Sequence, residues 1–235
     1  MLFIANVIVF FVTFLPSFST RYWFPALLGA YPAPAIFNVS KSYGLIPNNV
    51  LHGNQLYTVF TSIFLHADLI HLGGNMLFLY IFGDNVEDTF GHVRYLMFYF
   101  LAGVAASFAH ILFVANTLEG AIPTIGASGA ISGIMGAYLV LFPRSRILTL
   151  VLLFWISIAA IPAVIFLGLW FIFQFLYGTL AVGGGVAYWA HIGGFISGIV
   201  FLYMLKPRKS SIFTGSSGRN MGKSRRPSRR RGPWG

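Results

Sequence analysis

Two side chains of complementary chemistry stand in separate apolar segments of the sequence, Ser128 and His191. A serine hydroxyl is a weak nucleophile by itself and needs an adjacent base that accepts its proton. A neutral imidazole can take that proton and later return it to a leaving amine. Because no carboxylate occurs within the segments 126–142 and 186–205, the sequence predicts a Ser–His dyad without an orienting acid.

His71 and Asn75 could serve the same reaction as hydrogen-bond donors. They are four residues apart, which places both on one face of a helix. Attack on a carbonyl group creates an oxyanion, and each preorganised donor aimed at it contributes about 10²–10³ in rate. The backbone N–H of Ser128, near a helix N-terminus, adds a donor and a favourable dipole. We expect these three groups to form an oxyanion hole.

The composition indicates that membrane-spanning helices position these residues. Of the 235 residues, 57% are hydrophobic and 9% charged, whereas a soluble domain has about 25% charged residues. A spanning helix needs about 20 mainly apolar residues. The sequence therefore predicts an all-α polytopic membrane protein, a bundle of six transmembrane helices within residues 1–205. The six segments are 2–19, 67–83, 93–115, 126–142, 158–177 and 186–205.

One further apolar run lies between the fourth and fifth predicted spans. Residues 147–158 are expected to form either an interfacial segment or an extension of the fifth helix. In the second case, Pro162 would mark a kink or the start of that helix.

The distribution of Lys and Arg predicts the orientation in the membrane. Ten of the fifteen cations lie in residues 206–235, a Ser-, Gly- and Pro-rich tail predicted to be disordered. If both termini are cytoplasmic, thirteen cations lie inside and only Arg21 and Lys41 outside. The net charge of +10 is therefore assigned to a tail that is solvated or near anionic lipid, and not to nucleic-acid binding. Residues 20–66 become an apolar external loop, expected in the membrane interface or against the bundle.

In this orientation the second, fourth and sixth spans all run from outside to inside. The four candidate side chains lie near the outer ends of these spans. They are therefore expected at similar depth, in the outer half of the bilayer. Gly129-x-x-x-Gly133 and Gly194-x-x-x-Gly198 give the fourth and sixth spans faces of small residues. Such faces allow close helix packing, which would bring Ser128 within hydrogen-bond reach of His191.

The remaining histidines at membrane depth are assigned structural roles. His66 is expected to tie the external loop to the bundle, and His110 to make an interhelical hydrogen bond. The chain has no cysteine and lacks the His-Glu-x-x-His pattern of helical zinc proteases. Neither a metal nor a cofactor is expected.

Three motifs surround the candidate residues: Gly126-Ala127-Ser128-Gly129, Ala190-His191-Ile192-Gly193-Gly194 continuing to Gly198, and His71-Leu72-Gly73-Gly74-Asn75. They resemble the GxSG, AHxxGxxxG and HxxxN motifs of the rhomboid family, in its prokaryotic six-span branch. The resemblance covers about residues 45–205. A lone GxSG is weak, whereas three motifs in this order, each opening an outside-to-inside span, are highly specific.

The resemblance implies hydrolysis of peptide bonds within or beside transmembrane segments of substrate proteins, in the plasma membrane of a prokaryote. Ser128 would be the nucleophile and His191 the general base and acid. The substrate would enter laterally past the fifth span, where Trp170 and Gln174 resemble gate positions. The oligomeric state is left open.

Two departures from the family pattern affect the surroundings of the dyad. Tyr57-Thr58 replace a frequent Trp-Arg pair of the external loop, and Ser132 stands where some members place an aromatic residue that packs on the histidine. We expect the external loop and His191 to be held differently here.

The alternatives to the protease are a transporter or channel and a non-catalytic client-binding protein. A transporter or channel lined by His71 and His191 would need polar residues that continue to the inner face, whereas the fourth span beyond Ser132 is apolar. A non-catalytic rhomboid-like protein that holds membrane clients typically lacks the serine or the histidine. Both are present here, which favours the protease.

Overall fold

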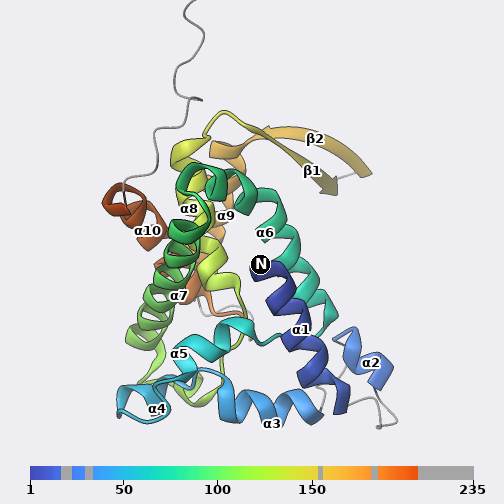
Figure 1. Ribbon diagram of the computed structural model, residues 1–235, viewed down its shortest axis with the longest axis vertical. Coiled ribbons are helices and arrows are strands. Elements are labelled where there is room, and N and C mark those ends of the chain that lie inside the picture. Colours follow the sequence, from blue (N-terminus) through green and yellow to red (C-terminus); the bar gives the residue numbers. More distant parts are fainter. Residues whose placement is uncertain (17–22, 30–33, 153–155, 181–184, 206–235) are drawn as a thin grey trace, which may run out of the picture.

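The computed structural model describes residues 1–16, 23–29, 34–152, 156–180 and 185–205, and it is dominated by a helical bundle (Figure 1). The predicted tail, residues 206–235, lies outside the described residues. Six apolar helices correspond to the six predicted segments: α1 (Leu2–Phe14), α6 (Leu69–Phe90), α7 (His92–Val114), α8 (Ser128–Leu141), α9 (Ala163–Leu180) and α10 (Tyr188–Leu205).

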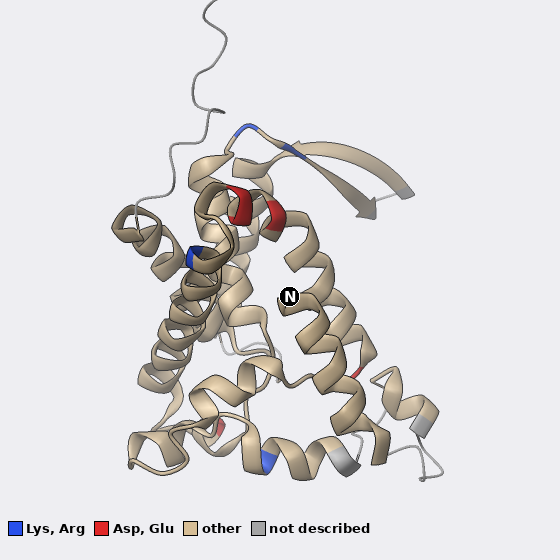
Figure 2. Cartoon of the chain, viewed as in Figure 1, with Lys and Arg blue, Asp and Glu red and all other residues tan. Residues whose placement is uncertain are grey.

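Length and composition make α7, α9 and α10 able to cross a membrane. The sharply bent pair formed by residues 58–64 and α6 adds a fourth candidate, and α1 and α8 are shorter apolar helices. The predicted helical polytopic membrane fold is confirmed, and the count of six spans stays a prediction. Figure 2 agrees with a membrane band, since the charged residues gather near the two ends of the bundle.

Local sequence signals mark the start of α6 and the break between α6 and α7. Asp68 caps α6, because its carboxylate accepts the backbone N–H of His71 at 2.8 Å. Gly91 separates α6 from α7 with a φ of 77°, a left-handed conformation that glycine adopts without steric cost.

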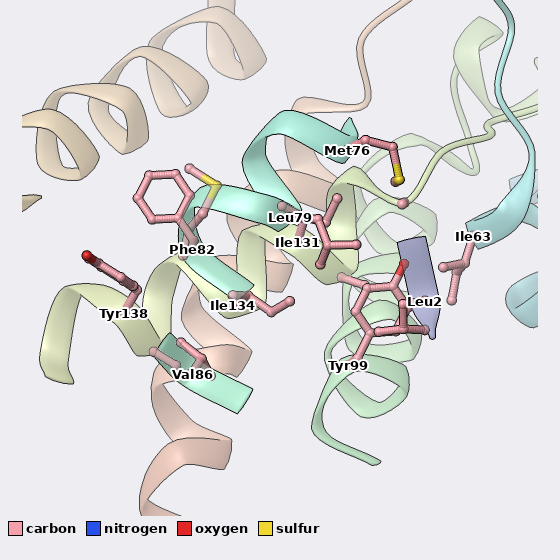
Figure 3. Close-up of a cluster of buried hydrophobic side chains, with 14 of the residues drawn as sticks. Leu2, Ile63, Met76, Leu79, Phe82, Val86, Tyr99, Ile131, Ile134 and Tyr138 are labelled. Carbon is pink, nitrogen blue, oxygen red and sulfur yellow. The ribbon is translucent and has the colours of Figure 1, made fainter. Parts of the chain in front are cut away.

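Helix α8 forms the centre of the bundle. Ten consecutive residues of α8, 129–138, are buried, as expected for a helix surrounded on all sides. Ile131 and Ile134 belong to a cluster that also contains Leu79 of α6 and Tyr99 of α7 (Figure 3). The nucleophile candidate therefore begins the most enclosed helix.

Helices α8 and α10 meet through their glycines. A β-carbon at Gly194 would overlap the carbonyl oxygen of Gly129, and one at Gly198 would overlap that of Gly133. Only glycine allows this approach of backbone to backbone. The small-residue faces thus lie at the α8–α10 contact.

The described part of the external loop, residues 23–29 and 34–66, folds into short helices at one end of the bundle (Figure 1). The helices are α2 (Trp23–Leu27), α3 (Pro34–Tyr43), α4 (Pro47–Leu51), α5 (Thr58–Thr61) and the 3₁₀ helix η2 (Ser62–Phe64). Leu45 and Thr124 exchange two backbone hydrogen bonds of 2.9 and 2.8 Å, and the N–H of Gly126 donates to the carbonyl of Ser62 at 2.9 Å. The loop is therefore joined by backbone bonds to the segment that leads into Ser128.

The residues that replace the Trp-Arg pair act within this loop. The hydroxyl of Tyr57 donates to the carbonyl of Ser42 at 2.9 Å, and Thr58, fully buried, donates to the carbonyl of Gln55 at 2.6 Å. Backbone pairing and these local bonds hold the loop.

The described residues of the run between α8 and α9 form strands and not an extension of the fifth helix, and the alternative of an interfacial segment stays a prediction. It is an antiparallel hairpin of β1 (Arg146–Leu152) and β2 (Ile156–Pro162), paired from Arg146 opposite Pro162 to Leu152 opposite Ile156. The alternative of a fifth helix extended over residues 147–158 is therefore wrong, and so is the predicted start of the fifth span at residue 158, since α9 begins directly after Pro162. Apolar periodicity does not separate a short strand from a buried helix segment, and the β-branched residues of this run favour strands.

Candidate active site

Ser128 and His191 are in direct contact. Ser128 is the first residue of α8, and its Oγ lies 2.8 Å from Nε2 of His191 in the first turn of α10. The two residues are 63 positions apart in the chain, and the glycine contacts between their helices allow the approach. The N–H of Ser128 is among the first four of its helix, which have no carbonyl partner within that helix.

A cavity of about 720 Å³ opens beside this pair. Its walls come from α3, α6, α7, α8, α9, α10 and the residues that precede α6, α8 and α10, and they are mainly apolar with a few convergent polar groups, as in small-molecule and peptide sites. Among the described polar residues that line it are His71, Asn75, His110, Ser128, Ser132 and His191.

His71 presents a proton toward the nucleophile. The backbone N–H of Ala67 donates to its Nδ1 at 3.4 Å, so the neutral ring carries its proton on Nε2. A β-carbon built on Gly126 would lie 2.9 Å from that Nε2 and 3.7 Å from Oγ of Ser128. The N–H of His71 thus faces the small space beside Ser128 that an oxyanion would need.

Gly126 is required at its position for two reasons. Its φ of +128° is one that L side chains rarely adopt, and any β-carbon would press on the ring of His71. The glycine keeps the space between His71 and Ser128 open.

Asn75 lies one turn after His71, buried at 7% exposure on the cavity wall. Its Nδ2 donates one hydrogen to the carbonyl of His71 at 2.9 Å. An amide carries a second N–H, which leaves a donor for the cavity.

Helix α9 supplies two contacts to His191 from residues one turn apart. The ring of Trp170 lies 5.8 Å from the imidazole, centroid to centroid, and also lines the cavity. Oε1 of Gln174 lies 2.7 Å from Nδ1 of His191. Trp170 thus packs on His191 as expected of the aromatic residue that some family members have at the position of Ser132. The hydroxyl of Ser132 bonds within its own helix, at the carbonyl of Ser128.

The resemblance to the rhomboid family implied a gate role for Gln174, and the contact of its amide with His191 was not predicted. A signal was present, since an amide in a largely apolar helix must find a partner. The identity of that partner depends on how α9 and α10 pack.

His66 and His110 contact residues outside the dyad. His66 is fully buried; its Nδ1 donates to the carbonyl of Phe64 at 3.3 Å, and its ring packs edge-on against His71 at 5.2 Å. Burial, and then the neighbouring His71, lower the pKa of His66 to about 3. His110 bonds to the hydroxyl of Thr124 at 3.0 Å, so its partner is the segment before α8 and not the helix that was predicted.

Among the residues that the structure describes, no three His, Asp or Glu side chains could together hold a metal ion. The absence of a metal or a cofactor stays a prediction.

Comparison with known proteins places the chain in a family. Residues 53–208, about two thirds of the chain, match the Rhomboid domain. The chain belongs to the rhomboid family. All four candidate residues lie inside the matched rhomboid region.

The curated relatives of this rhomboid include one protein named a protease and one named inactive. RHOMBOID-like protein 1 of Arabidopsis thaliana is 32% identical over 179 residues, 74% of this chain and 41% of the relative. Inactive RHOMBOID-like protein 8 of the same plant is 30% identical over 170 residues, 70% of this chain and 42% of the relative. Rhomboid protease GluP of Bacillus subtilis is 35% identical over 98 residues, 42% of this chain and 18% of the relative. The chain spans less than half the length of each of these three proteins.

Proposed function

We propose that this rhomboid is an intramembrane serine endopeptidase that cleaves the transmembrane segments of other proteins. The observation that carries the proposal is the 2.8 Å contact between Oγ of Ser128 and Nε2 of His191 at the wall of an apolar cavity. Family membership alone does not decide activity, because the relatives include one named inactive and one named a protease. The proposed nucleophile Ser128 and the proposed base His191 are both present here, at hydrogen-bonding distance.

The geometry supports a two-step acyl transfer. Oγ of Ser128 attacks the scissile carbonyl carbon while Nε2 of His191 takes its proton, and the C–O π electrons move to the carbonyl oxygen. The N–H of Ser128, Nε2–H of His71 and the free N–H of Asn75 are the donors available to that oxyanion. As the tetrahedral intermediate collapses, His191 returns the proton to the leaving amine, and water then hydrolyses the acyl-enzyme.

The cavity supports a substrate that comes from the bilayer. Its described walls include Ile70 and Phe78 of α6 on one side and Trp170 and Tyr177 of α9 on the other. An apolar segment could reach Ser128 between these two helices without crossing the charged end of the bundle. We propose this lateral route, with Trp170 at its edge.

The proposed orientation places both termini in the cytoplasm and the cavity toward the outer face. The excess of Lys and Arg on the inner side supports it. A prokaryotic plasma membrane stays a prediction, since the relatives come from plants, yeast and a bacterium.

The deciding experiment incubates the purified protein with a transmembrane substrate and, in parallel, with a fluorophosphonate probe. Ser128→Ala and His191→Ala should abolish cleavage, and Ser128→Ala should abolish labelling. Ser197→Ala is the matched control, because within the described part of the chain that hydroxyl bonds to its own helix, at the carbonyl of Gly194. Cleavage that survives in Ser128→Ala would overturn the proposal, and a wild-type protein that binds substrates without cleaving them would indicate a client-binding protein.

A further inference from the structure

Gln174 contacts the nitrogen of His191 that faces away from Ser128. The two bonds of the imidazole, to Oε1 of Gln174 at 2.7 Å and to Oγ of Ser128 at 2.8 Å, use different ring nitrogens. An amide oxygen only accepts, so Nδ1 must carry the proton of the neutral ring. Nε2 then holds the lone pair that takes the proton of Ser128.

We propose that Gln174 is a positioning residue that completes a Ser128–His191–Gln174 relay, in the place that an acid occupies in other serine hydrolases. This inference rests on the proposed function. When His191 takes the proton of Ser128 it becomes a cation, and the hydrogen bond from Nδ1 becomes charge-assisted and stronger. An interaction that strengthens along the reaction coordinate lowers the barrier and raises kcat.

The surroundings support positioning rather than contact with substrate. Gln174 is absent from the described residues that line the cavity, whereas His191 and Trp170 are present. Trp170 packs on the imidazole one helical turn earlier, at 5.8 Å. The same face of α9 therefore fixes both the tautomer and the tilt of the ring.

An amide has a specific advantage at this depth. A carboxylate would carry a charge among apolar helices, at a high desolvation cost. A neutral amide oxygen accepts the same proton without that cost, and it gives up part of the electrostatic stabilisation of the imidazolium. We infer that this compromise lets a dyad enzyme keep an oriented base inside a bilayer.

The test compares Gln174→Leu, Gln174→Met and Gln174→Glu with the wild type in two assays, fluorophosphonate labelling of Ser128 and cleavage of a transmembrane substrate. Leu and Met remove the acceptor at similar volume, and Glu keeps an acceptor oxygen. Thr179→Val is the matched control, because Thr179 lies on the same helix and, among the described residues, its hydroxyl bonds to the carbonyls of Phe175 and Leu176 and not to His191.

For Gln174→Leu and Gln174→Met we expect labelling and kcat to fall together by about 10- to 100-fold, with KM unchanged. Gln174→Glu should recover most of the labelling rate. Nitrogen NMR of labelled histidine, with the His191 signal assigned by its loss in His191→Ala, should show Nδ1 protonated in the wild type and mixed tautomers in Gln174→Leu.

Three results would overturn the inference while the proposed function stands. In the first, both apolar variants label and cleave at the wild-type rates. In the second, cleavage slows while labelling is unchanged, which would make Gln174 a gate for large substrates. In the third, the wild-type His191 carries its proton on Nε2. A wild type that neither labels nor cleaves would instead overturn the proposed function.

Discussion

The carbonyl oxygen of Gly133 faces Gly198 so closely that a β-carbon at position 198 would overlap it. Gly133 lies five residues after Ser128 in α8, and Gly198 lies seven residues after His191 in α10. The separation of these two helices is therefore set by backbone atoms, and the 2.8 Å contact of the dyad depends on it.

Replacing Gly198 by Ala should force α8 and α10 apart. Overpacking of this kind costs about 1–3 kcal/mol of stability, and a displacement of about 1 Å at a reacting pair can cost about 100-fold in rate. Gly168→Ala is the matched control, because a β-carbon there meets nothing within 4 Å. The midpoint of thermal unfolding and the rate of fluorophosphonate labelling measure the two effects. Equal values for Gly198→Ala and Gly168→Ala would contradict the prediction.

Replacing His71 by Ala should lower kcat by about 10²–10³ with little change in KM, as expected for a donor that acts only on the oxyanion. Steady-state cleavage of a transmembrane substrate measures both constants. The control is His52→Ala, in the external loop, whose ring bonds to the nearby carbonyl of Asn48. A rise in KM with kcat unchanged would instead assign His71 to substrate binding.

Replacing Asp68 by Ala should remove the cap of α6 and cost about 1 kcal/mol. The loss should also reach catalysis, because the capped N–H belongs to His71. Asp68→Asn keeps an acceptor oxygen and should retain most of the stability. Thermal unfolding together with kcat tests this, and the idea fails if Asn and Ala at position 68 are equally destabilising.

The stability of the protein should fall as the pH falls below about 6.5. Burial, and then His71, lower the pKa of His66 to about 3, whereas an unfolded histidine titrates near 6.5. Between these values only the unfolded state binds the proton, which destabilises the fold by about 2 kcal/mol between pH 6.5 and 5. His66→Phe keeps a ring without a titrating group and should show a shallower decline of Tm with pH. An unchanged slope would assign the effect to other groups.

Much of the fold follows from the sequence because hydrophobic length is a strong signal in membranes. Each of the six predicted segments overlaps one apolar helix of the structure. The approach of Ser128 to His191 could also be predicted, because the glycines that permit it lie on the same two helices.

The β1–β2 hairpin and the partner of His191 escaped prediction for a different reason. Apolar residues 147–158 satisfy either a strand or a helix, and only pairing across the hairpin decides between them. The bond from His191 to Gln174 joins two helices whose relative rotation the sequence does not encode locally. Polar residues at membrane depth can be listed from sequence, but their pairing is a property of packing.

The base of the hairpin has a mechanical consequence for α9. The N–H groups of Ala163 and Val164 donate to the carbonyls of Ser145 and Pro143 at 2.8 and 3.1 Å, so the helix is clamped where it starts. Along α9 only Ala163 and Leu167 are buried, so the rest of the helix can tilt about its fixed N-terminal end at the hairpin. Gln174 lies about 16 Å from that end at 1.5 Å per residue, and a tilt of about 5° would therefore move Gln174 by about 1.4 Å. Lateral pressure of the bilayer on the C-terminal end of α9 could then loosen the hold of Gln174 on the proposed base, His191, without any contact between lipid and His191.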